Sequence, residues 1–275
     1  MRRPTIGVFD SGFGGLTVLK ALVELNPAAD YLYFGDTARL PYGSKSVETV
    51  GRYAVEAAHF LEGQGADILV IACNTATALA LDRIVGASRV PVLGVVEPGA
   101  EAAAACTRNK KIVVIGTEAT VSSHAYLKAL QAQGLHATEK ACPLLVPLVE
   151  EGWTEHPVTE EVARIYLDEA FSGSFADADV LLLGCTHYPL LKPLLQRVAT
   201  GKVMIVDSAH SVAQKVGGSL KTLSMTLRPL EPTEERRGLP RFEFFATDSV
   251  EKFRRLGPHF LGHAIDEVRH VDLKE

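Results

Sequence analysis

The sequence predicts an α/β protein with two pseudo-symmetric, doubly wound lobes, mainly parallel sheets and an active site in the cleft between the lobes. Short aliphatic and β-branched runs alternate with longer amphipathic stretches, which is the pattern of repeated βα units. Most of these runs are continuously apolar, as strands buried on both faces of a parallel sheet require. Similar motifs recur in the same order in two parts of the chain, which indicates two related lobes.

The predicted strands are the short apolar runs. They are Thr5–Phe9, Tyr31–Phe34, Asp67–Ala72, Val90–Val95, Lys111–Ile115, Leu144–Leu148, Val180–Leu183, Val203–Val206 and Arg241–Ala246. The predicted helices include the amphipathic stretches Leu16–Leu25, Val47–Glu62, Val121–Gln133 and Thr159–Phe171. The segment Leu227–Pro240 combines prolines with charged residues and is predicted to be an exposed loop.

The two lobes are inferred from three pairs of corresponding run ends. These pairs are Asp10 with Thr117, Asp36 with Glu150, and Cys73 with Cys185. The first lobe is predicted to comprise residues 1–97 and 207–275, and the second lobe residues 98–206. Because ligands of open α/β sheets bind at the carboxyl ends of strands, the side chains at these ends are candidate site residues.

The composition excludes several classes of protein. Of the 275 residues, 47% are hydrophobic and 22% are charged, as in globular proteins and unlike disordered or collagenous chains. The net charge of −5 argues against a nucleic-acid partner, because nucleic acids bind basic surfaces. The sequence contains no secretion signal and no apolar run of membrane-spanning length, so we expect no membrane association and a cytoplasmic location.

The cysteine pattern bears on the redox state and on metal binding. Cys73, Cys106, Cys142 and Cys185 are scattered and form no CxxC pair, so reduced thiols are expected. Cys185 and His187 together provide too few ligands for a zinc ion, and no metal is expected.

A glycine-rich motif, Asp10-Ser11-Gly12-Phe13-Gly14-Gly15, follows the first predicted strand and opens a helix. Its glycines allow a tight turn, and the Ser11 hydroxyl with the helix N–H groups could hold an anion. A plain strand-to-helix turn is the alternative. A dinucleotide-binding loop would have glycine where Thr17 stands, so a nicotinamide cofactor is not expected.

Cys73 and Cys185 occupy matching places at the ends of predicted strands. Cys73 precedes a helix, whose dipole favours the thiolate form. Each cysteine alone would most simply be an inert buried thiol, but matching positions in two related lobes favour a working pair. Cys106, on an alanine-rich helix, and Cys142, just before a predicted strand, lack this placement and are interpreted as structural.

Polar side chains accompany the two thiols. Asp10 is the candidate neighbour of Cys73, and Glu150 or His187 that of Cys185. The alternatives are a solvated carboxylate at a strand end and a locally bonded histidine at a helix start. The turn that contains Pro41, Tyr42 and Gly43 offers backbone N–H groups and a hydroxyl to an anion, unless it is only a loop. Neutral donors for a carboxylate are Ser11, Asn74, Thr75, Thr117, Thr120 and Thr186.

Two thiols that approach one ligand from opposed lobes suit the inversion of a stereocentre. One thiolate removes a proton from carbon while the other thiol delivers a proton to the opposite face. A free thiol has a pKa of about 8.5, close enough to neutrality for both forms to be reached. The substrate proton next to a carboxylate is far less acidic, so the resulting carbanion must be stabilised by dipoles and by desolvation. These motifs contain no Arg or Lys, so a charged ligand would be held by backbone and hydroxyl dipoles.

The chain resembles the glutamate racemases of the cofactor-independent aspartate/glutamate racemase family, through motifs spread over most of its length. The motifs are Gly7-Val8-Phe9-Asp10-Ser11-Gly12-Phe13-Gly14-Gly15-Leu16-Thr17-Val18, Gly35-Asp36-Thr37-Ala38, Pro41-Tyr42-Gly43, Ala72-Cys73-Asn74-Thr75-Ala76, Gly116-Thr117 with Ala119-Thr120, Pro147-Leu148-Val149-Glu150 and Leu183-Gly184-Cys185-Thr186-His187-Tyr188-Pro189. The resemblance implies interconversion of L- and D-glutamate without a cofactor, D-glutamate for peptidoglycan, and a homodimer.

The resemblance also implies roles for individual residues. Cys73 would deprotonate D-glutamate with the help of Asp10, and Cys185 would deprotonate L-glutamate with the help of His187. Glu150, or Glu151 beside it, would be a further carboxylate of the site. The remaining implied contacts surround the substrate. Those near its α-carbon are Ser11, Asn74, Thr75, Thr117, Thr120 and Thr186, and those near its side-chain carboxylate are Pro41, Tyr42 and Gly43.

Three alternatives stay open at this level. One is a racemase for aspartate or another amino acid on the same scaffold. Another is an amino-acid-binding protein that does not turn its ligand over. A cysteine redox sensor is the weakest, because no CxxC pair provides a resolving thiol.

Overall fold

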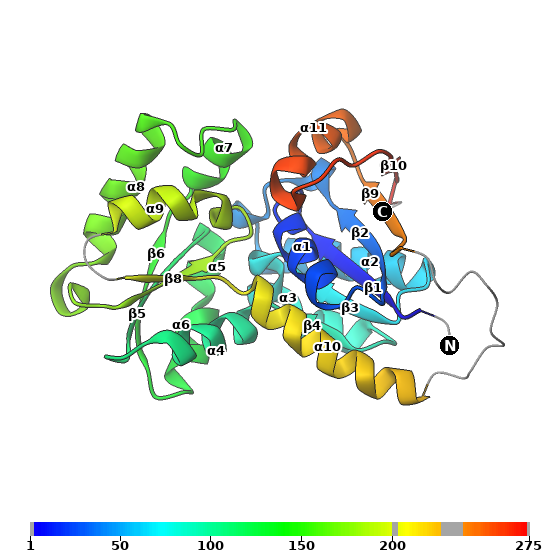
Figure 1. The fold of residues 1–275 in the computed structure, drawn as a ribbon, viewed down its shortest axis with the longest axis horizontal. Helices are drawn as coiled ribbons and strands as arrows, with labels where there is room; N and C mark the ends of the chain where they lie inside the picture. The colour runs from blue at the N-terminus through cyan, green and yellow to red at the C-terminus, as the bar shows by residue number, and fades with distance from the viewer. Residues whose placement is uncertain (1–2, 200–202, 227–238, 274–275) are drawn as a thin grey trace.

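The computed structural model describes residues 3–199, 203–226 and 239–273, and the predicted loop Leu227–Pro240 lies outside these ranges up to residue 238. The described residues form two separate parallel β-sheets that lie side by side, each with its own helices (Figure 1). This arrangement confirms the predicted α/β fold of two lobes with mainly parallel sheets. Both chain ends lie on the lobe of the larger sheet.

The larger sheet has six strands in the order β10-β9-β2-β1-β3-β4. Its strands are β1 (Thr5–Asp10), β2 (Asp30–Gly35), β3 (Ile68–Ile71), β4 (Val92–Gly94), β9 (Phe242–Ala246) and β10 (Arg269–His270). The C-terminal strand β9 pairs with β2, so the chain returns to the first sheet after it has built the second. We call this half of the molecule the first lobe.

The smaller sheet has four strands in the order β6-β5-β7-β8. Its strands are β5 (Lys111–Gly116), β6 (His136–Ala141), β7 (Val180–Gly184) and β8 (Met204–Val206). This order repeats β2-β1-β3-β4, and the registers correspond as well, since Ile6 pairs with Ile68 and Ile112 with Val180. We call this half the second lobe. The exact boundaries at residues 97/98 and 206/207 stay predictions.

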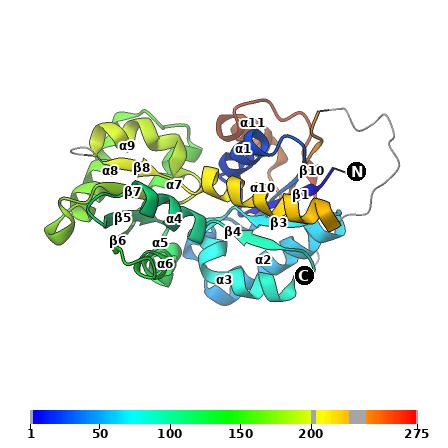
Figure 2. The same cartoon turned by 60° about the horizontal axis from the view of Figure 1, so that its bottom comes forward.

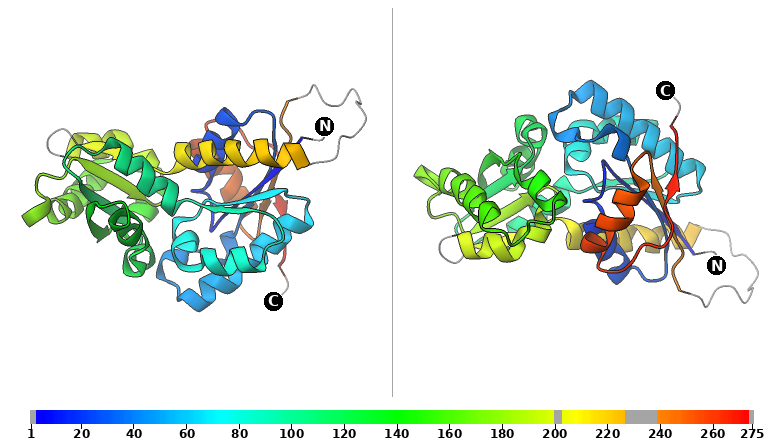
Figure 3. Two further views of the ribbon diagram at one scale, coloured as in Figure 1. Left: turned by 90° about the horizontal axis from the view of Figure 1, so that it is seen from below. Right: turned by 90° about the horizontal axis from the view of Figure 1, so that it is seen from above.

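Helices cover both faces of each sheet, because successive side chains of a strand point to opposite faces. In the first lobe, Ile6 and Val8 pack in a core with α1, and Phe9 packs with α2 in another. The first-lobe helices are α1 (Leu16–Leu25), α2 (Val47–Gly63), α3 (Asn74–Ala87), α10 (Ala209–Thr226) and α11 (Val250–Leu261). Figure 3 shows α10 beginning near the junction of the lobes and running along the first lobe.

The second lobe is layered in the same way. Val113 and Leu181 face one core, and Val114 and Leu182 face another on the opposite side of the sheet. The remaining helices are α4 (Val96–Cys106), α5 (Glu118–Ser123), α6 (Ala125–Gln131), α7 (Leu145–Glu150), α8 (Pro157–Ala170) and α9 (Lys192–Val198). In Figure 2, α8 and α9 cover one face of this sheet, and α5 and α6 lie on the other. Among the described residues, no helix is long and apolar enough to cross a membrane.

Each sheet reverses its strand order beside its first strand. The chain runs from β1 outward to β2 and then crosses to β3 on the other side of β1, and β5, β6 and β7 repeat this path. Loops leave such a switch point in opposite directions and open a crevice at the carboxyl ends of the strands. Ser11 and Cys73 follow β1 and β3, and Thr117 and Cys185 follow β5 and β7.

The predicted strand Leu144–Leu148 is wrong, because residues Leu145–Glu150 form helix α7. A short apolar run does not distinguish a buried strand from a buried helix. Pro147, which lacks an N–H group, is tolerated in the first turn of a helix. The predicted helix Val121–Gln133 is divided into α5 and α6 at His124, which has a φ of 55°.

Two strands have no counterpart among the predictions. Strand β6 (His136–Ala141) alternates polar and small residues and lies at the edge of the second sheet. Edge strands are partly exposed and often carry charges, so a search for continuous apolar runs misses them. Strand β10 has only two residues, Arg269 and His270.

Candidate active site

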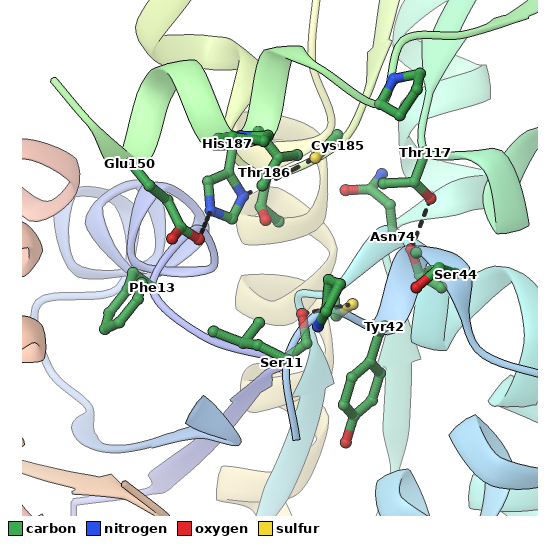
Figure 4. A pocket seen from close by; sticks show the side chains of 18 of the residues that line it. Ser11, Phe13, Tyr42, Ser44, Asn74, Thr117, Glu150, Cys185, Thr186 and His187 are labelled. Carbon is green, nitrogen blue, oxygen red and sulfur yellow. Dashed lines mark hydrogen bonds and ion pairs between the residues drawn. The ribbon is translucent and has the colours of Figure 1, made fainter. Parts of the chain in front are cut away.

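A cavity of about 470 Å³ lies between the lobes at the carboxyl ends of their strands. Most of the predicted site residues line it, and they come from both lobes (Figure 4). Those that line it are Ser11, Pro41, Tyr42, Gly43, Cys73, Asn74, Thr75, Thr117, Glu150, Cys185, Thr186 and His187. Figure 4 shows Glu150, His187 and Cys185 along one side of the cavity, with Ser11 and Tyr42 opposite.

Asp10 and Thr120, the other two predicted site residues, lie behind the cavity wall and are fully buried. Asp10 accepts a hydrogen bond from the Gly12 N–H at 2.8 Å and one from the Thr186 hydroxyl of the other lobe at 3.4 Å. The Thr120 hydroxyl lies 3.2 Å from that of Thr75 and 2.9 Å from that of Thr117. Both residues therefore act on the cavity through the side chains in front of them.

The thiol of Cys73 lies at the N-terminus of α3. Its sulfur accepts a hydrogen bond from the Ala76 N–H at 3.4 Å, and the thiol donates to the Ser11 hydroxyl at 3.5 Å. Burial, with the charge of Asp10, raises the pKa of Cys73 to about 12, although the contacts with Ser11 and Ala76 oppose the rise. The expectation that the helix dipole favours a thiolate here is therefore wrong, because desolvation outweighs the dipole.

Burial also raises the pKa of the Asp10 carboxyl, while His187 and the backbone N–H groups of Gly12 and Gly15 oppose the rise. The first-lobe side of the cavity thus combines two groups whose neutral forms are favoured by burial.

The thiol of Cys185 has charged neighbours. Its sulfur lies 3.9 Å from Nδ1 of His187, and Nε2 of the same ring lies 3.3 Å from Oε1 of Glu150. Burial disfavours a charged imidazole, but the contacts with Cys185 and Glu150 raise the pKa of His187 to about 10. A pKa of about 10 leaves the ring positively charged at neutral pH, between Glu150 and the sulfur of Cys185.

Glu150 is the C-terminal residue of helix α7, not of a strand as predicted. The structure also separates it from its neighbour, since Glu150 lines the cavity whereas Glu151 is exposed and does not. Burial opposes the charge of Glu150, but contacts with His187 and Lys252 lower its pKa to about 2. Glu150 is therefore an anion at neutral pH.

Lys252 on α11 also lines the cavity, and no sequence motif pointed to it. Its Nζ donates to Oε2 of Glu150 at 2.7 Å. It is the only Lys or Arg among the described residues that line the cavity. Its helix lies far along the chain from the recognised motifs, so only the folded structure brings it to the site.

Hydroxyl and amide groups of the two lobes meet on another part of the wall. The hydroxyls of Thr75 and Thr117 lie 2.9 Å apart, and the Asn74 side-chain NH₂ donates to the Tyr126 hydroxyl at 2.6 Å. This donation turns the amide oxygen of Asn74 away from Tyr126. The wall thus provides uncharged hydrogen-bonding groups, as the sequence predicts.

The turn with Pro41, Tyr42 and Gly43 closes one end of the cavity. The Tyr42 hydroxyl, expected to be available to an anion, instead donates to the buried carboxylate of Asp36. Figure 4 shows this hydroxyl directed away from Cys185 and His187. Tyr42 therefore holds the turn in place rather than offering its hydroxyl to the cavity.

The glycine-rich loop also brings the lobes together. A Cβ atom on Gly14 would lie 2.2 Å from the Thr186 hydroxyl and 2.6 Å from Nδ1 of His187. The cavity lining from this loop comes from Ser11 and Phe13. Gly14 is thus needed for the close approach of the second lobe, a role that the sequence motif alone did not indicate.

No group of three or more His, Cys, Asp or Glu side chains in the described part of the chain is arranged to hold a metal ion. Its four cysteines are free thiols. Cys142, predicted to precede a strand, follows strand β6 and is buried.

Comparison with known proteins places the chain in a family. The family model described as Asp/Glu/Hydantoin racemase matches residues 6–216. A glutamate racemase of Koribacter versatilis is 60% identical, and the match covers 99% of this chain and 98% of that protein.

Solved structures agree. The glutamate racemase of Thermus thermophilus in complex with beta-chloro-D-alanine is 45% identical, with a TM-score of 0.84 over 98% of both chains. That of Francisella tularensis in complex with D-glutamate is 34% identical, with a TM-score of 0.87 over 98% of both chains. On the strength of the family match, the full-length relatives and the shared fold, this chain belongs to the Asp/Glu/hydantoin racemase family.

Proposed function

We propose that this protein is a glutamate racemase that interconverts L- and D-glutamate through Cys73 and Cys185. The observation that carries the proposal is that two cysteines at corresponding strand ends, one in each lobe, line a single cavity. The full-length relative from Koribacter versatilis, named a glutamate racemase, supports glutamate as the substrate.

In the proposed reaction, the thiolate of Cys185 takes the α-proton of L-glutamate. The C–H bond breaks, an S–H bond forms, and the electron pair stays on the α-carbon as a carbanion. The thiol of Cys73 then delivers its proton to the opposite face, which yields D-glutamate and a Cys73 thiolate. The reverse reaction begins at Cys73, and no redox change or cofactor is required.

The neighbours of each thiol suit these roles. The His187 imidazolium stabilises a thiolate at Cys185 by its charge, and Glu150 keeps the ring charged. Burial keeps Cys73 protonated and ready to donate. Asp10 lies close enough to influence the proton that Cys73 would release, because the charge of the Asp10 carboxyl is one cause of the raised pKa of Cys73.

The substrate would be held mainly by neutral donors and by one cation. Ser11, Asn74, Thr75, Thr117 and Thr186 line the cavity within reach of an α-amino acid, and Thr120 supports two of these hydroxyls. Backbone groups of the turn with Pro41, Tyr42 and Gly43 would meet the side-chain carboxylate. A dry site lined by fixed dipoles stabilises developing negative charge more effectively than water does.

The cellular setting is part of the proposal. D-glutamate is a building block of peptidoglycan, so the reaction would supply cell-wall synthesis in the cytoplasm. We further propose that the protein acts as a homodimer.

The decisive experiment follows the circular dichroism of L-glutamate with the purified protein and no added cofactor. The signal should decay to zero, and in D₂O the α-position should take up deuterium. Cys73→Ala and Cys185→Ala should each lose more than about a thousandfold in kcat. Substantial racemisation by either variant would reject the two-thiol mechanism.

A parallel panel of L-aspartate and other L-amino acids tests the substrate. Preference for aspartate would move the proposal to another amino acid on the same scaffold. Saturable binding of glutamate with a constant dichroic signal would leave a binding protein without turnover.

A further inference from the structure

Lys252 links the two lobes at the edge of the cavity. It lies on α11, which packs against α1 in the first lobe, whereas its partner Glu150 ends α7 in the second lobe. Figure 1 shows α11 and α7 on the same side of the molecule, facing each other across the junction. The Lys252 Nζ to Glu150 Oε2 distance is 2.7 Å, so this ion pair spans the lobes directly.

The contact continues to the thiol. While Oε2 of Glu150 accepts from Lys252, its other oxygen, Oε1, lies 3.3 Å from Nε2 of His187. Nδ1 of the same ring lies 3.9 Å from the Cys185 sulfur. Lys252, Glu150, His187 and Cys185 thus form one continuous chain of contacts from the first lobe to the thiol.

We propose that Lys252 is a positioning residue for the Cys185 half of the reaction: it holds the Glu150 carboxylate against His187 from the opposite lobe. The inference rests on the proposed racemase function, because it concerns the proton step assigned to Cys185. Lys252 acts through Glu150 and does not touch the reacting atoms.

The position of Glu150 explains why it needs a cation. A carboxylate at the C-terminus of a helix faces the negative end of the helix dipole, which disfavours it. Its side chain is only 15% exposed, so water compensates little. The incoming substrate would add two further carboxylates to a cavity that also contains Glu118. Without Lys252, we expect the Glu150 side chain to turn toward solvent and away from His187.

Lys252 is itself held in place by the first lobe. Its Nζ lies 5.4 Å from the centre of the Phe13 ring, a cation–π contact. Phe13 belongs to the loop that follows β1 and also lines the cavity. The charge is therefore fixed relative to the first lobe, and it fixes a side chain of the second.

The test compares Lys252→Met with Lys252→Arg in the full-length protein. The methionine variant removes the charge but keeps an unbranched side chain, and we expect kcat to fall about tenfold, the usual effect of one lost charged hydrogen bond. The arginine variant should recover most of this loss. Lys252→Gln serves as a second uncharged variant if the methionine variant folds poorly.

Lys215→Met is the matched control. Lys215 on α10 pairs with Glu101 on α4 at the same Nζ to Oε distance of 2.7 Å and with similar exposure, but away from the cavity. The Lys215→Met substitution should leave kcat unchanged. Equal activities of Lys252→Met and Lys215→Met would overturn the inference.

Isotope effects identify which proton step Lys252 serves. The two enantiomers have equal free energies in water, so every substitution changes kcat/KM equally in both directions. The deuterium isotope effect on kcat/KM has no such constraint. In Lys252→Met it should increase for [2-²H]-L-glutamate, whose deuteron goes to Cys185, and decrease for [2-²H]-D-glutamate.

Glu150→Gln provides the background that separates positioning from direct substrate binding. If Lys252 acts through Glu150, adding Lys252→Met to Glu150→Gln has little further effect. A fully additive loss, with a raised KM and unchanged isotope effects, would mean that Lys252 binds the substrate itself and would refute the positioning role. The cysteine variants test the racemase function separately, so either proposal can fail without the other.

Discussion

The two sides of the cavity share a backbone plan but differ in charge. In both lobes, a cysteine follows the strand that lies beside the first strand of its sheet. The Cys73 side holds a buried carboxyl, Asp10, and a protonated thiol with a pKa raised to about 12. The Cys185 side holds an imidazolium, His187, and an ionised carboxylate, Glu150.

This difference shows that topology places the thiols, whereas the surrounding side chains determine the charge around each of them. In the proposed reaction, one thiol gives up a proton while the other accepts one, so two identical environments would favour the same protonation state at both thiols. The two environments are unequal: burial raises the pKa of the Cys73 thiol, whereas Cys185 lies beside the charged pair of His187 and Glu150.

The strongest test of this difference replaces Asp10 beside Cys73 and, in a separate variant, His187 beside Cys185. Asp10→Asn and His187→Asn should each reduce kcat about a hundredfold, as expected for a lost acid–base helper. Their isotope effects on kcat/KM should move in opposite directions. Asp10→Asn should enlarge the effect for [2-²H]-D-glutamate, and His187→Asn that for [2-²H]-L-glutamate. Parallel changes in the two variants would contradict the division of roles.

Glu150→Gln removes one cause of the positive charge on His187. Contacts with Cys185 and Glu150 raise the pKa of His187 against the effect of burial, so the substitution should lower this pKa from about 10. The nitrogen chemical shifts of ¹⁵N-labelled histidine report the change, with His187→Asn identifying the signal. An unchanged titration would show that Glu150 does not hold the ring charged.

The positive charge of His187 predicts that the free energy of unfolding depends on pH. The folded-state pKa of His187, about 10, exceeds the ordinary value of about 6.5. Its contribution is therefore fully present below pH about 6.5 and is lost as the pH rises toward about 10. The free energy of unfolding in urea should fall across this range in the wild type and fall less in Glu150→Gln. A parallel decline in both proteins would assign the loss to other groups.

The smallest expected effect lies at the turn behind the cavity. Tyr42→Phe removes the hydrogen bond to buried Asp36 and should cost about 1–3 kcal/mol of stability. Asp36 keeps its bonds from Arg39 and Thr247, so the fold should survive. Thermal denaturation measures the loss. A kcat close to that of the wild type would agree with a structural role of this hydroxyl.

Much of the fold was predictable from local sequence pattern. The central strands are continuously apolar, and Cys73 and Cys185 end two of them, so the strand ends that meet at the cavity could be located. Helix α7 could not be predicted, because a five-residue apolar run fits a strand as well as a helix. The polar edge strand β6 could not be predicted either, because an edge strand needs little apolar surface.

The site was predictable only where its residues lie in motifs. The contacts between lobes, such as Asp10 with Thr186 and Asn74 with Tyr126, depend on how two separately folded sheets dock. Lys252 could not be predicted as a site residue, because the local sequence pattern of a lysine on an amphipathic helix is the same whether its side chain is exposed to solvent or paired with a carboxylate. The helix-dipole argument for Cys73 failed for a related reason, since sequence does not report the degree of burial.

Gly14 influences the distance between the two walls of the cavity, across which the proposed reaction would move a proton. The absence of a single methyl group there lets the turn that carries Thr186 and His187 lie directly against the loop that follows Asp10. The methyl group of an alanine at this position would push the two lobes apart and widen the cavity between Cys73 and Cys185. The distance between the two walls of the cavity is thus limited by Gly14, a residue that does not itself line the cavity.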